Sequence, residues 1–523
     1  MKVLFTALYP MFMYHLVVEL EIMQKHLDLG DEITIAGCNA ALRTCECNKA
    51  GQLHHCLRCI GLRQDGLSLL KGNYKTIQWP EEAPVLPHDL KTTFRNSHEL
   101  RNYKYKDYDM GAALFASLVE TTRDVDVNPA EHPKVMKALL HDAYKAYSFA
   151  EKELAENHYD VVYVFNGKYA TARPWLYHSQ KRGVTYRTHE RTSGLHTYYV
   201  FENTMPHEPT QYAGLIREYW KEHHQDPHIR AEAIEFFEER PKGLLTGWTS
   251  FTKDQQAELL PAGWCETKRN IAVFASSEGE FNGLPGIFLP RIFSTQIEGL
   301  LRIARDMLST PEFHLYVRIH PNSLNEKRKW WEDAELVQLS NITIVAPDSK
   351  VSSYALLKAA EKTMVFSSTM GIEATYYGKP CILANECYYR GMDAVYEPET
   401  PQEIVQLLKS DLQPKDKEKA IAYGAYWRCG GHPLRYSEAV NYYTLSFRGK
   451  LINARPEVYD WYNKCQARPA AGTLYKIWQD WQDKRKFREV FNACDGWLAE
   501  TPRPHNLKDE KCASCQQHAE AHS

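Results

Sequence analysis

Residues 2–36, KVLFTALYPMFMYHLVVELEIMQKHLDLGDEITIA, form a strand, a helix and a second strand in sequence order. Residues 2–8 are a short apolar run of the kind found in buried strands, and residues 14–27 have the spacing of an amphipathic helix. Residues 32–36 are a second apolar run that follows a Gly-Asp turn. This order predicts a βαβ unit, which favours a parallel sheet.

The pattern continues through the first half of the chain, with predicted helices at residues 133–157 and 170–181. Apolar strands at residues 161–165 and 184–187 are each followed by a polar triplet. Open α/β sheets bind their ligands at the carboxyl ends of the strands. The residues of interest there are Asn166, Lys168, His189, Glu190 and Arg191. An ordinary salt bridge from Glu190 to Arg187 or Arg191 is the alternative interpretation.

A Pro-, Gly- and Trp-rich stretch at residues 240–270 separates this half from a new series of strands and helices that begins at residues 271–275. The pattern predicts an α/β chain of two doubly wound Rossmann-like domains that face each other across a cleft. The expected domains are residues 1–245, with a cysteine-rich loop at 38–59, and residues 246–450. A helical tail over residues 451–523 is expected to pack across both.

The segment RIHPN, residues 318–322, ends a predicted strand at residues 313–319. Side chains alternate along a strand, so Arg318 and His320 lie on one face and emerge at the carboxyl end. Pro321 stops the strand because it has no N–H group for the ladder. We expect a ligand group at His320, although a structural histidine bonded to a neighbouring carbonyl would show the same pattern.

The segment SSTMGIEATYYGKP, residues 367–380, follows the strand at 363–366 and opens a helix. Ser367, Ser368 and Thr369 place three hydroxyl groups beside the unpaired N–H groups of a helix start, which predicts an anion site. Glu373 is out of register for a capping box. We therefore expect its carboxylate to accept hydrogen bonds from a ligand, such as those of ribose hydroxyls.

At this point the chain resembles a known group of proteins. The segments that carry the resemblance are RIHPN at 318–322, SKVSSYALL at 349–357, FSSTMGIEATYYGKP at 366–380, VFNG at 164–167 and HER at 189–191. Residues 270–408 resemble the capsule polysaccharide biosynthesis proteins, which include the Kdo transferases of capsule assembly and have the GT-B fold. The resemblance implies that His320 with Pro321, and Ser367 with Ser368, bind the donor nucleotide and its phosphate.

The resemblance further implies a nucleotide-sugar-dependent glycosyltransferase whose catalysis needs no metal. It would move a sugar, such as Kdo from CMP-Kdo, to a capsule polysaccharide or a lipid-linked glycan, alongside the capsule assembly machinery. Arg318, Thr369 and Glu373 would complete the donor site. Glu190 is the candidate base, with His320 as the second catalytic residue, because Glu190 follows an N-terminal strand and could face the donor across the cleft. The alternatives are a glycerophosphotransferase, a sugar-nucleotide epimerase, or a non-catalytic polysaccharide assembly factor.

Five cysteines lie close together in the sequence, at Cys38, Cys45, Cys47, Cys56 and Cys59. They offer more than the four soft ligands that a tetrahedral Zn²⁺ requires, and the last pair has C-x2-C spacing. The spacing predicts a structural zinc site. Reduced thiols without a metal and an iron–sulfur cluster remain the alternatives.

The charge and hydropathy of the chain limit its partners and its location. With 63 Lys and Arg against 66 Asp and Glu, the formal net charge is -3, which argues against nucleic acid as a partner. His15 and Glu19 interrupt the apolar run near the N-terminus, so neither a signal peptide nor a membrane span is expected there. We expect a cytoplasmic protein. Trp478 and Trp481, followed by four cations, predict a helix that packs between the domains or contacts the inner membrane surface.

Overall fold

A computed structural model of the chain describes residues 1–6, 9–80, 84–124, 127–243, 252–277, 291–325, 329–439 and 445–452. The chain divides into two compact units, Met1–Arg455 and Pro456–Ser523. The predicted tail helix with Trp478 and Trp481 lies outside the described residues. The account below therefore concerns the first unit.

The first sheet is formed mainly by the N-terminal half of the chain and has seven strands in the order β12-β6-β5-β4-β1-β2-β3. They are β1 (Lys2–Phe5), β2 (Glu32–Gly37), β3 (Tyr74–Gln78), β4 (Val161–Phe165), β5 (Thr185–Arg191), β6 (Thr197–Glu202) and β12 (His432–Pro433). The strands β1 to β5 are parallel, whereas β6 and β12 pair antiparallel at one edge. The order 3-2-1-4-5 of the parallel strands is that of a doubly wound sheet.

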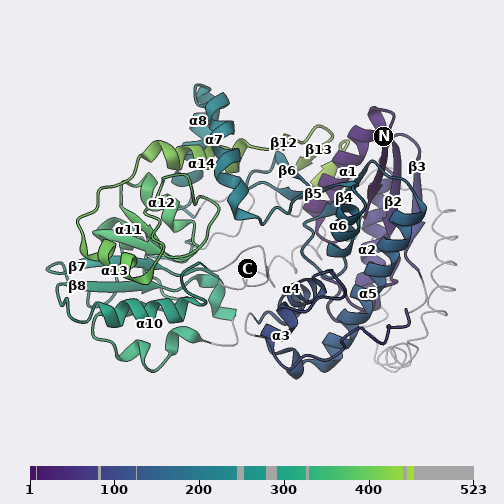
Figure 1. Cartoon of the computed structure of the whole chain (residues 1–523). Helices are drawn as coiled ribbons and strands as arrows, with labels where there is room; N and C mark the ends of the chain where they lie inside the picture. The colour runs from purple at the N-terminus through teal and green to yellow at the C-terminus, as the bar shows by residue number, and fades with distance from the viewer. Residues whose placement is uncertain are drawn as a thin grey trace, which may run out of the picture. The chain divides into compact units, whose positions relative to one another are not determined.

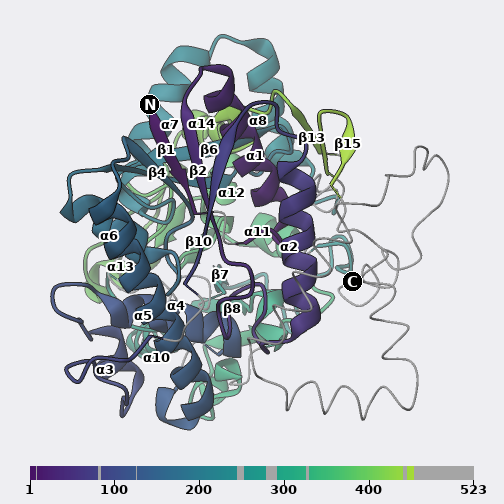
Figure 2. The ribbon, with the colours of Figure 1, turned by 90° about the vertical axis from the view of Figure 1, so that its right-hand side faces the viewer.

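Helices cover both faces of this sheet, as Figures 1 and 2 show. They are α1 (Met13–Asp28) and α2 (Leu53–Leu67) on one face, and α5 (Pro133–Glu156) and α6 (Arg173–Lys181) on the other. Side chains alternate along β1, so Val3 and Phe5 are buried under α1 whereas Leu4 is buried under α5 and α6. A strand buried on both faces reads as a continuous apolar run, as residues 2–5 do.

The second sheet has five parallel strands in the order β11-β10-β7-β8-β9. They are β7 (Arg269–Phe274), β8 (Phe313–Arg318), β9 (Ile342–Val345), β10 (Lys362–Val365) and β11 (Cys381–Leu383). Helices α10 (Gln296–Asp306) and α13 (Pro401–Lys409) cover one face, and α11 (Ser353–Ala359) and α12 (Met370–Tyr376) cover the other. This sheet has the same winding as the first. The predicted fold class, α/β with two doubly wound Rossmann-type halves as in GT-B-like proteins, is confirmed.

Three helices connect the two halves: α7 (Tyr212–His223), α8 (Pro227–Glu238) and α14 (Lys417–Cys429). Their apolar residues share one core with α11 and α12. After α14 the chain returns to the first sheet, where β12 pairs with β6. It then forms a small antiparallel sheet of β13 (Ser437–Ala439), β14 (Leu445–Phe447) and β15 (Lys450–Leu451), whose residues pack against α1.

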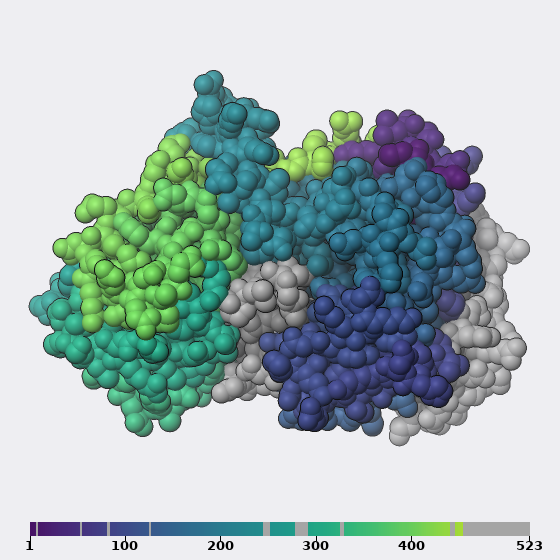
Figure 3. Space-filling view, viewed as in Figure 1, coloured from purple at the N-terminus to yellow at the C-terminus, as the bar shows by residue number. Residues whose placement is uncertain are grey.

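A separate group of apolar residues lies under α3 (Ser97–Arg101) and α4 (Met110–Thr122), which pack against α5. The space-filling view shows the segment that carries α3 and α4, in dark blue, as one continuous region of the surface (Figure 3). In the part of the chain that the structure describes, no helix is long and apolar enough to cross a membrane.

Two strand boundaries differ from the prediction in ways that affect the site. β1 ends at Phe5, earlier than the predicted residue 8. β5 extends to Arg191 because residues 187–191 pair with the antiparallel strand β6. The triplet His189–Arg191 is therefore the end of a strand and not a loop that follows one.

Candidate functional site

The carboxyl edge of the first sheet carries a polar cluster built around Asn166 and Glu190. Asn166 follows β4 with φ 62°, and Gly167 follows with φ 82°, so the backbone turns sharply at the strand end. A Cβ atom on Gly167 would lie 2.5 Å from the Leu176 side chain, so only glycine fits there. The turn directs the Asn166 amide back to the sheet, where Nδ2 donates to Glu190 Oε2 at 3.2 Å.

Helix α1 contributes two residues to this cluster that the sequence analysis did not select as site residues. His15 Nε2 lies 3.4 Å from Glu190 Oε1, and one helical turn later Glu19 Oε1 lies 3.4 Å from His189 Nε2. Two imidazole–carboxylate pairs therefore join α1 to the end of β5. His189 is fully buried, whereas 23% of the Glu190 side chain is exposed. Glu190 is thus the member of the two pairs that a substrate can reach.

Burial controls the ionisation of the histidines in this cluster. It lowers the pKa of His15 well below the ordinary value, and nearby His189 and Arg191 lower it further. Burial also lowers the pKa of His207, whose Nε2 lies 3.3 Å from the Asn166 amide. Both rings are therefore neutral near pH 7. Glu190 consequently sits beside a neutral imidazole rather than an imidazolium.

The remaining residues predicted for this edge are at its margin. Lys168 is half-buried, with Nζ 5.0 Å from the centre of the Tyr169 ring. The backbone N–H of Arg191 donates to Glu190 Oε1 at 3.0 Å. Arg187 does not serve as the salt-bridge partner considered for Glu190, because its guanidinium binds Glu202 at 2.8 Å.

The carboxyl edge of the second sheet brings three polar residues to adjacent strands. Ser276 follows β7, His320 follows β8 and Ser367 follows β10, and these strands are neighbours in the order β10-β7-β8. The Ser367 N–H donates to Ser276 Oγ at 2.9 Å. In a sheet with this winding, β7 and β10 flank the topological switch point where open α/β sheets bind ligands.

The His320 ring is held in one orientation by the turn that follows β8. Its Nδ1 accepts a hydrogen bond from the Asn322 N–H at 3.2 Å, within the short helix η3 (Pro321–Asn325). Burial, together with Arg318, lowers the pKa of His320 to about 4. The neutral ring therefore carries its proton on Nε2, because Nδ1 is used as an acceptor. His320 is thus a neutral N–H donor at the edge of the sheet.

Arg318 has a different role from the one expected. Its guanidinium donates to the carbonyl oxygens of Ala346, Pro347 and Ser349 in the loop after β9, at 3.2 Å for Ser349. Only 3% of the residue is exposed. The arginine therefore holds that loop in place and does not present its charge to a ligand.

The start of α12 offers fewer unpaired groups than the sequence suggested. The Met370 N–H donates to Ser368 Oγ at 3.3 Å, and the Gly371 N–H donates to the Ser368 carbonyl at 3.2 Å. The Ser368 carbonyl also accepts a hydrogen bond from the Tyr389 hydroxyl at 2.6 Å. The hydroxyl and the carbonyl of Ser368 are thus both used in local hydrogen bonds. Ser367, which is half-buried, is the serine of this segment that a ligand can reach.

The expectation that the Glu373 carboxylate is available to a ligand is wrong. Oε1 contacts Arg240 at 3.3 Å and accepts from the Thr369 hydroxyl at 3.1 Å, while Oε2 accepts from the Tyr354 hydroxyl. Only 1% of Glu373 is exposed. Its carboxylate therefore links α12 to α8 and α11. Thr369, although exposed, uses its hydroxyl within the same contact.

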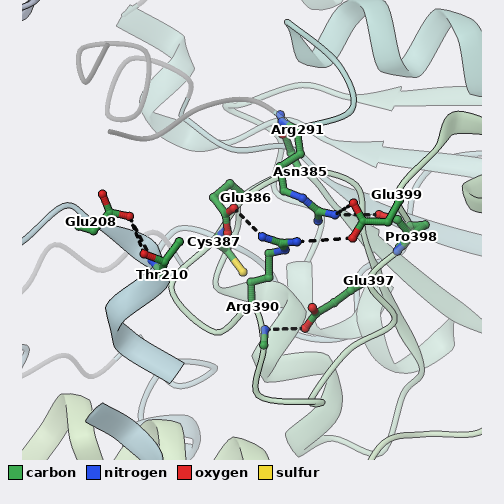
Figure 4. A network of polar contacts seen from close by, with 11 residues as sticks. Glu208, Thr210, Arg291, Asn385, Glu386, Cys387, Arg390, Glu397, Pro398 and Glu399 are labelled. Carbon is green, nitrogen blue, oxygen red and sulfur yellow. Dashed lines mark hydrogen bonds and ion pairs between the residues drawn. The ribbon is translucent and has the colours of Figure 1, made fainter. Parts of the chain in front are cut away.

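A network of ion pairs holds the loop after β11, beside Ser368. Figure 4 shows Arg291 and Arg390 converging on Glu399, with N–O distances of 2.5 and 3.5 Å. Arg390 also contacts Glu386 at 3.3 Å. The loop supplies two carboxylates and one guanidinium group to these contacts, and Arg291, which precedes α10, supplies the second guanidinium group, so the charges of these contacts balance.

Three of the five clustered cysteines, Cys38, Cys45 and Cys47, lie between β2 and α2, and Cys56 and Cys59 are in α2 itself. Cys47 and Cys59 are hydrogen-bonded through their side chains, and Asn48 Nδ2 donates to Cys56 Sγ at 3.1 Å. Burial raises the pKa of the Cys45 and Cys47 thiols. Among the described residues, no group of three or more His, Cys, Asp or Glu is arranged to hold a metal ion. Zinc binding stays a prediction.

Helix α5 fixes the beginning of this cysteine-rich loop. The Asp142 carboxylate accepts hydrogen bonds from the Arg43 and Thr44 N–H groups, the latter at 2.8 Å. One turn along the helix, Lys145 Nζ donates to the Ala41 carbonyl at 2.9 Å. The loop is therefore anchored by buried charges whether or not its thiols bind a metal.

Residues missed by the sequence analysis share one property: their partners are distant in sequence. His15 and Glu190 are separated by 175 positions, and Ser276 and Ser367 by 91. A usable signal did exist in the sequence for three of these residues. His15 and Glu19 are spaced i, i+4 on the first helix, and Ser276 directly follows an apolar strand, as Ser367 does.

Comparisons with known proteins give fold-level similarity only. No protein-family profile matches the chain, and no curated protein matches it. Thermosulfurimonas dismutans KpsC, a beta Kdo 2,4 transferase, is 15% identical over 51% of this chain and 79% of its own, with a TM-score of 0.36. Thermosulfurimonas dismutans KpsC, beta Kdo 2,7 transferase, is 16% identical over 54% of this chain and 80% of its own, with a TM-score of 0.31. UDP-GlcNAc 2-epimerase from Neisseria meningitidis is 14% identical over 81% of this chain and 97% of its own, with a TM-score of 0.25. These values assign the chain to no family.

Proposed function

We propose that the protein is a nucleotide-sugar-dependent glycosyltransferase. One observation carries this proposal: neutral polar groups from three adjacent strands gather at the switch point of the second sheet, where the Ser276 hydroxyl accepts the Ser367 N–H and the His320 ring is oriented as a donor. A leaving nucleotide develops negative charge on its phosphate, and donors that are oriented in advance stabilise that charge. The motifs RIHPN and SSTMGIE, which resemble those of capsule Kdo transferases, support the same assignment.

The donor site we propose is smaller than the sequence suggested. His320 would donate its Nε2–H, and Ser367 its hydroxyl, to the phosphate oxygens. Arg318 and Glu373 would contribute indirectly, because their charged groups hold the loop after β9 and the start of α12. The nature of the sugar, Kdo or another, and a polysaccharide or lipid-linked acceptor are proposals that rest on the motif resemblance alone.

Glu190 would be the base on the first sheet. It is the partly exposed carboxylate of the polar cluster, and Asn166 and the Arg191 N–H orient its two oxygens. In the reaction, the acceptor hydroxyl would attack the anomeric carbon of the sugar. A new C–O bond forms, the bond to the nucleotide phosphate breaks, the hydroxyl proton goes to Glu190 and the nucleotide leaves with the negative charge.

The test begins with thermal shift of the full chain against CMP-, UDP-, GDP- and CDP-linked sugars. A ligand that binds only the folded protein raises its melting temperature. For a nucleotide sugar that binds, release of the free nucleotide is then followed by chromatography with water or a glycan as acceptor. We expect binding and slow release, both reduced in Ser367→Ala. Absence of any shift across the panel, or product that is an isomerised nucleotide sugar, would contradict the transferase assignment.

A further inference from the structure

The contact between His15 and Glu190 joins a helix that begins near the N-terminus to a strand 175 positions later. His15 Nε2 lies 3.4 Å from Glu190 Oε1, while the other oxygen of Glu190 is bound by Asn166 at 3.2 Å. His15 is only 7% exposed, against 23% for the Glu190 side chain. The histidine therefore lies behind the carboxylate, away from the position that a substrate would occupy.

We infer that His15 is a positioning residue that holds Glu190 in its working orientation through an Nε2–H···Oε1 hydrogen bond. This inference rests on the proposed role of Glu190 as the base. Hydrogen bonds in catalytic groups are often long in the free enzyme and shorten when the substrate binds. A separation of 3.4 Å is in keeping with that behaviour.

The surroundings of His15 favour one protonation pattern. A carboxylate only accepts hydrogen bonds, so the ring nitrogen that faces Glu190 must carry a proton. Nδ1 of His15 is buried and has no hydrogen-bond partner among the described residues. Phe165 packs against the ring with centroids 4.0 Å apart, which fixes its plane. A neutral ring with its proton on Nε2 satisfies each of these constraints.

The groups around the ring explain why His15 supports the base and does not replace it. Glu190, His189 and Arg191 face it from β5, and Glu19 lies one turn along its own helix. Burial, together with His189 and Arg191, lowers the pKa of His15, so moving the proton of an acceptor hydroxyl onto this ring would be unfavourable. Glu190 can take that proton, and His15 then keeps the carboxyl group in place.

Three variants separate positioning from general support of the fold. In His15→Phe, the volume is kept and the donor is lost. In His15→Gln, an amide N–H replaces Nε2–H at nearly the same distance from the backbone. The matched control is His26→Gln on the same helix, where a buried imidazole contacts Asp31 at 2.7 Å at the opposite end of α1.

We expect kcat for sugar transfer to fall about 100-fold in His15→Phe, because small displacements of a catalytic group cost that much. The KM for the nucleotide sugar should stay within about twofold, since the donor binds at the other sheet. His15→Gln should recover most of the rate, and His26→Gln should keep kcat although it is less stable. Equal losses in His15→Phe and His15→Gln, or a loss confined to KM, would overturn the inference.

A second measurement does not depend on enzymatic activity. The ¹⁵N NMR spectrum of histidine-labelled protein, with His15 assigned from the His15→Gln spectrum, reports which ring nitrogen carries the proton. We expect a single neutral form protonated on Nε2, and a mixture of the two neutral forms in Glu190→Ala. A proton on Nδ1 in the wild-type protein, or identical spectra for both proteins, would refute the contact. If no nucleotide sugar is turned over but the spectra behave as expected, the proposed function fails while the contact stands.

Discussion

The replacement of His320 by asparagine tests the donor site with the least damage to the structure. The Nδ1 atom of His320 accepts the Asn322 N–H at 3.2 Å, so His320→Ala would remove two interactions at once. The Asn side-chain oxygen can occupy the position of Nδ1 and keep the bond to Asn322. His320→Asn therefore removes Nε2–H alone. His320→Gln is the matched control, because its longer side chain can return an N–H group to the position of Nε2.

The expected magnitude follows from the charge state of the ring. A pKa of about 4 means that about one His320 ring in a thousand is charged at pH 7. The group lost in His320→Asn is thus a neutral, oriented donor. Loss of one such donor to a developing negative charge typically costs about 100- to 1,000-fold in rate, or about 2.7 to 4 kcal/mol in the transition state. Nucleotide affinity should change far less, because the charge is small before the bond breaks.

The assay measures single-turnover release of nucleotide and, separately, nucleotide binding by calorimetry, for the wild type and both variants. His320→Asn should lose rate with near-normal affinity, and His320→Gln should be intermediate. The wild-type rate should also be insensitive to His320 ionisation between about pH 5.5 and 8, because the lowered pKa keeps the ring neutral above about pH 5. A wild-type rate in His320→Asn, or a loss that appears wholly in binding, would refute the role of His320 as a transition-state donor.

Further predictions concern residues outside the two edges. Glu21→Ala should lower the free energy of unfolding, measured by urea titration, by about 3 to 5 kcal/mol. The buried carboxylate accepts the Arg435 N–H at 2.6 Å and two further donors, and all three would be left unpaired. An unchanged midpoint of the urea transition would disprove this prediction. Glu373→Gln should also destabilise the protein in urea, yet leave nucleotide affinity by calorimetry within about twofold, since its carboxylate is committed to internal partners. Protein purified without added metal should contain about one zinc per chain by elemental analysis, lost in Cys56→Ser with Cys59→Ser; folded protein with neither zinc nor iron would end that hypothesis.

Strands with a continuous apolar run were predictable, and β4 is the clearest case, although its partner β1 is distant in sequence. The apolar run at residues 161–165 matches the strand Val161–Phe165 because it is buried on both faces, which produces an unbroken apolar signal. β5 was predicted to end at residue 187 and extends to Arg191. Its last residues are polar, and Glu190 and Arg191 extend the strand beyond β4 by pairing with the antiparallel strand β6. No local pattern carries that information.

The candidate site shows the same limit in its side chains. The sequence pattern placed His320 and Ser367 at strand ends of one sheet, because both directly follow apolar strands, and these strands, β8 and β10, lie on either side of β7. It could not show that the Glu373 carboxylate already has internal partners, since one of them, Arg240, is 133 positions away in the sequence. His15 was interpreted only as an interruption of an apolar run. Its partner on β5 becomes visible once the sheet order brings α1 over that strand.

The two sheet edges differ in charge in a way that suits the proposed transfer reaction. The first edge presents a carboxylate, Glu190, backed by the neutral ring of His15. The second edge presents neutral donors, while the charge of Arg318 is directed into carbonyl groups of a loop. A cationic donor site would bind the nucleotide tightly before and after transfer, which would slow its release. Neutral donors stabilise the transition state more than the bound substrate, because negative charge develops there. In the proposed reaction, the bonding of Arg318 to the loop after β9 would therefore favour turnover over tight binding.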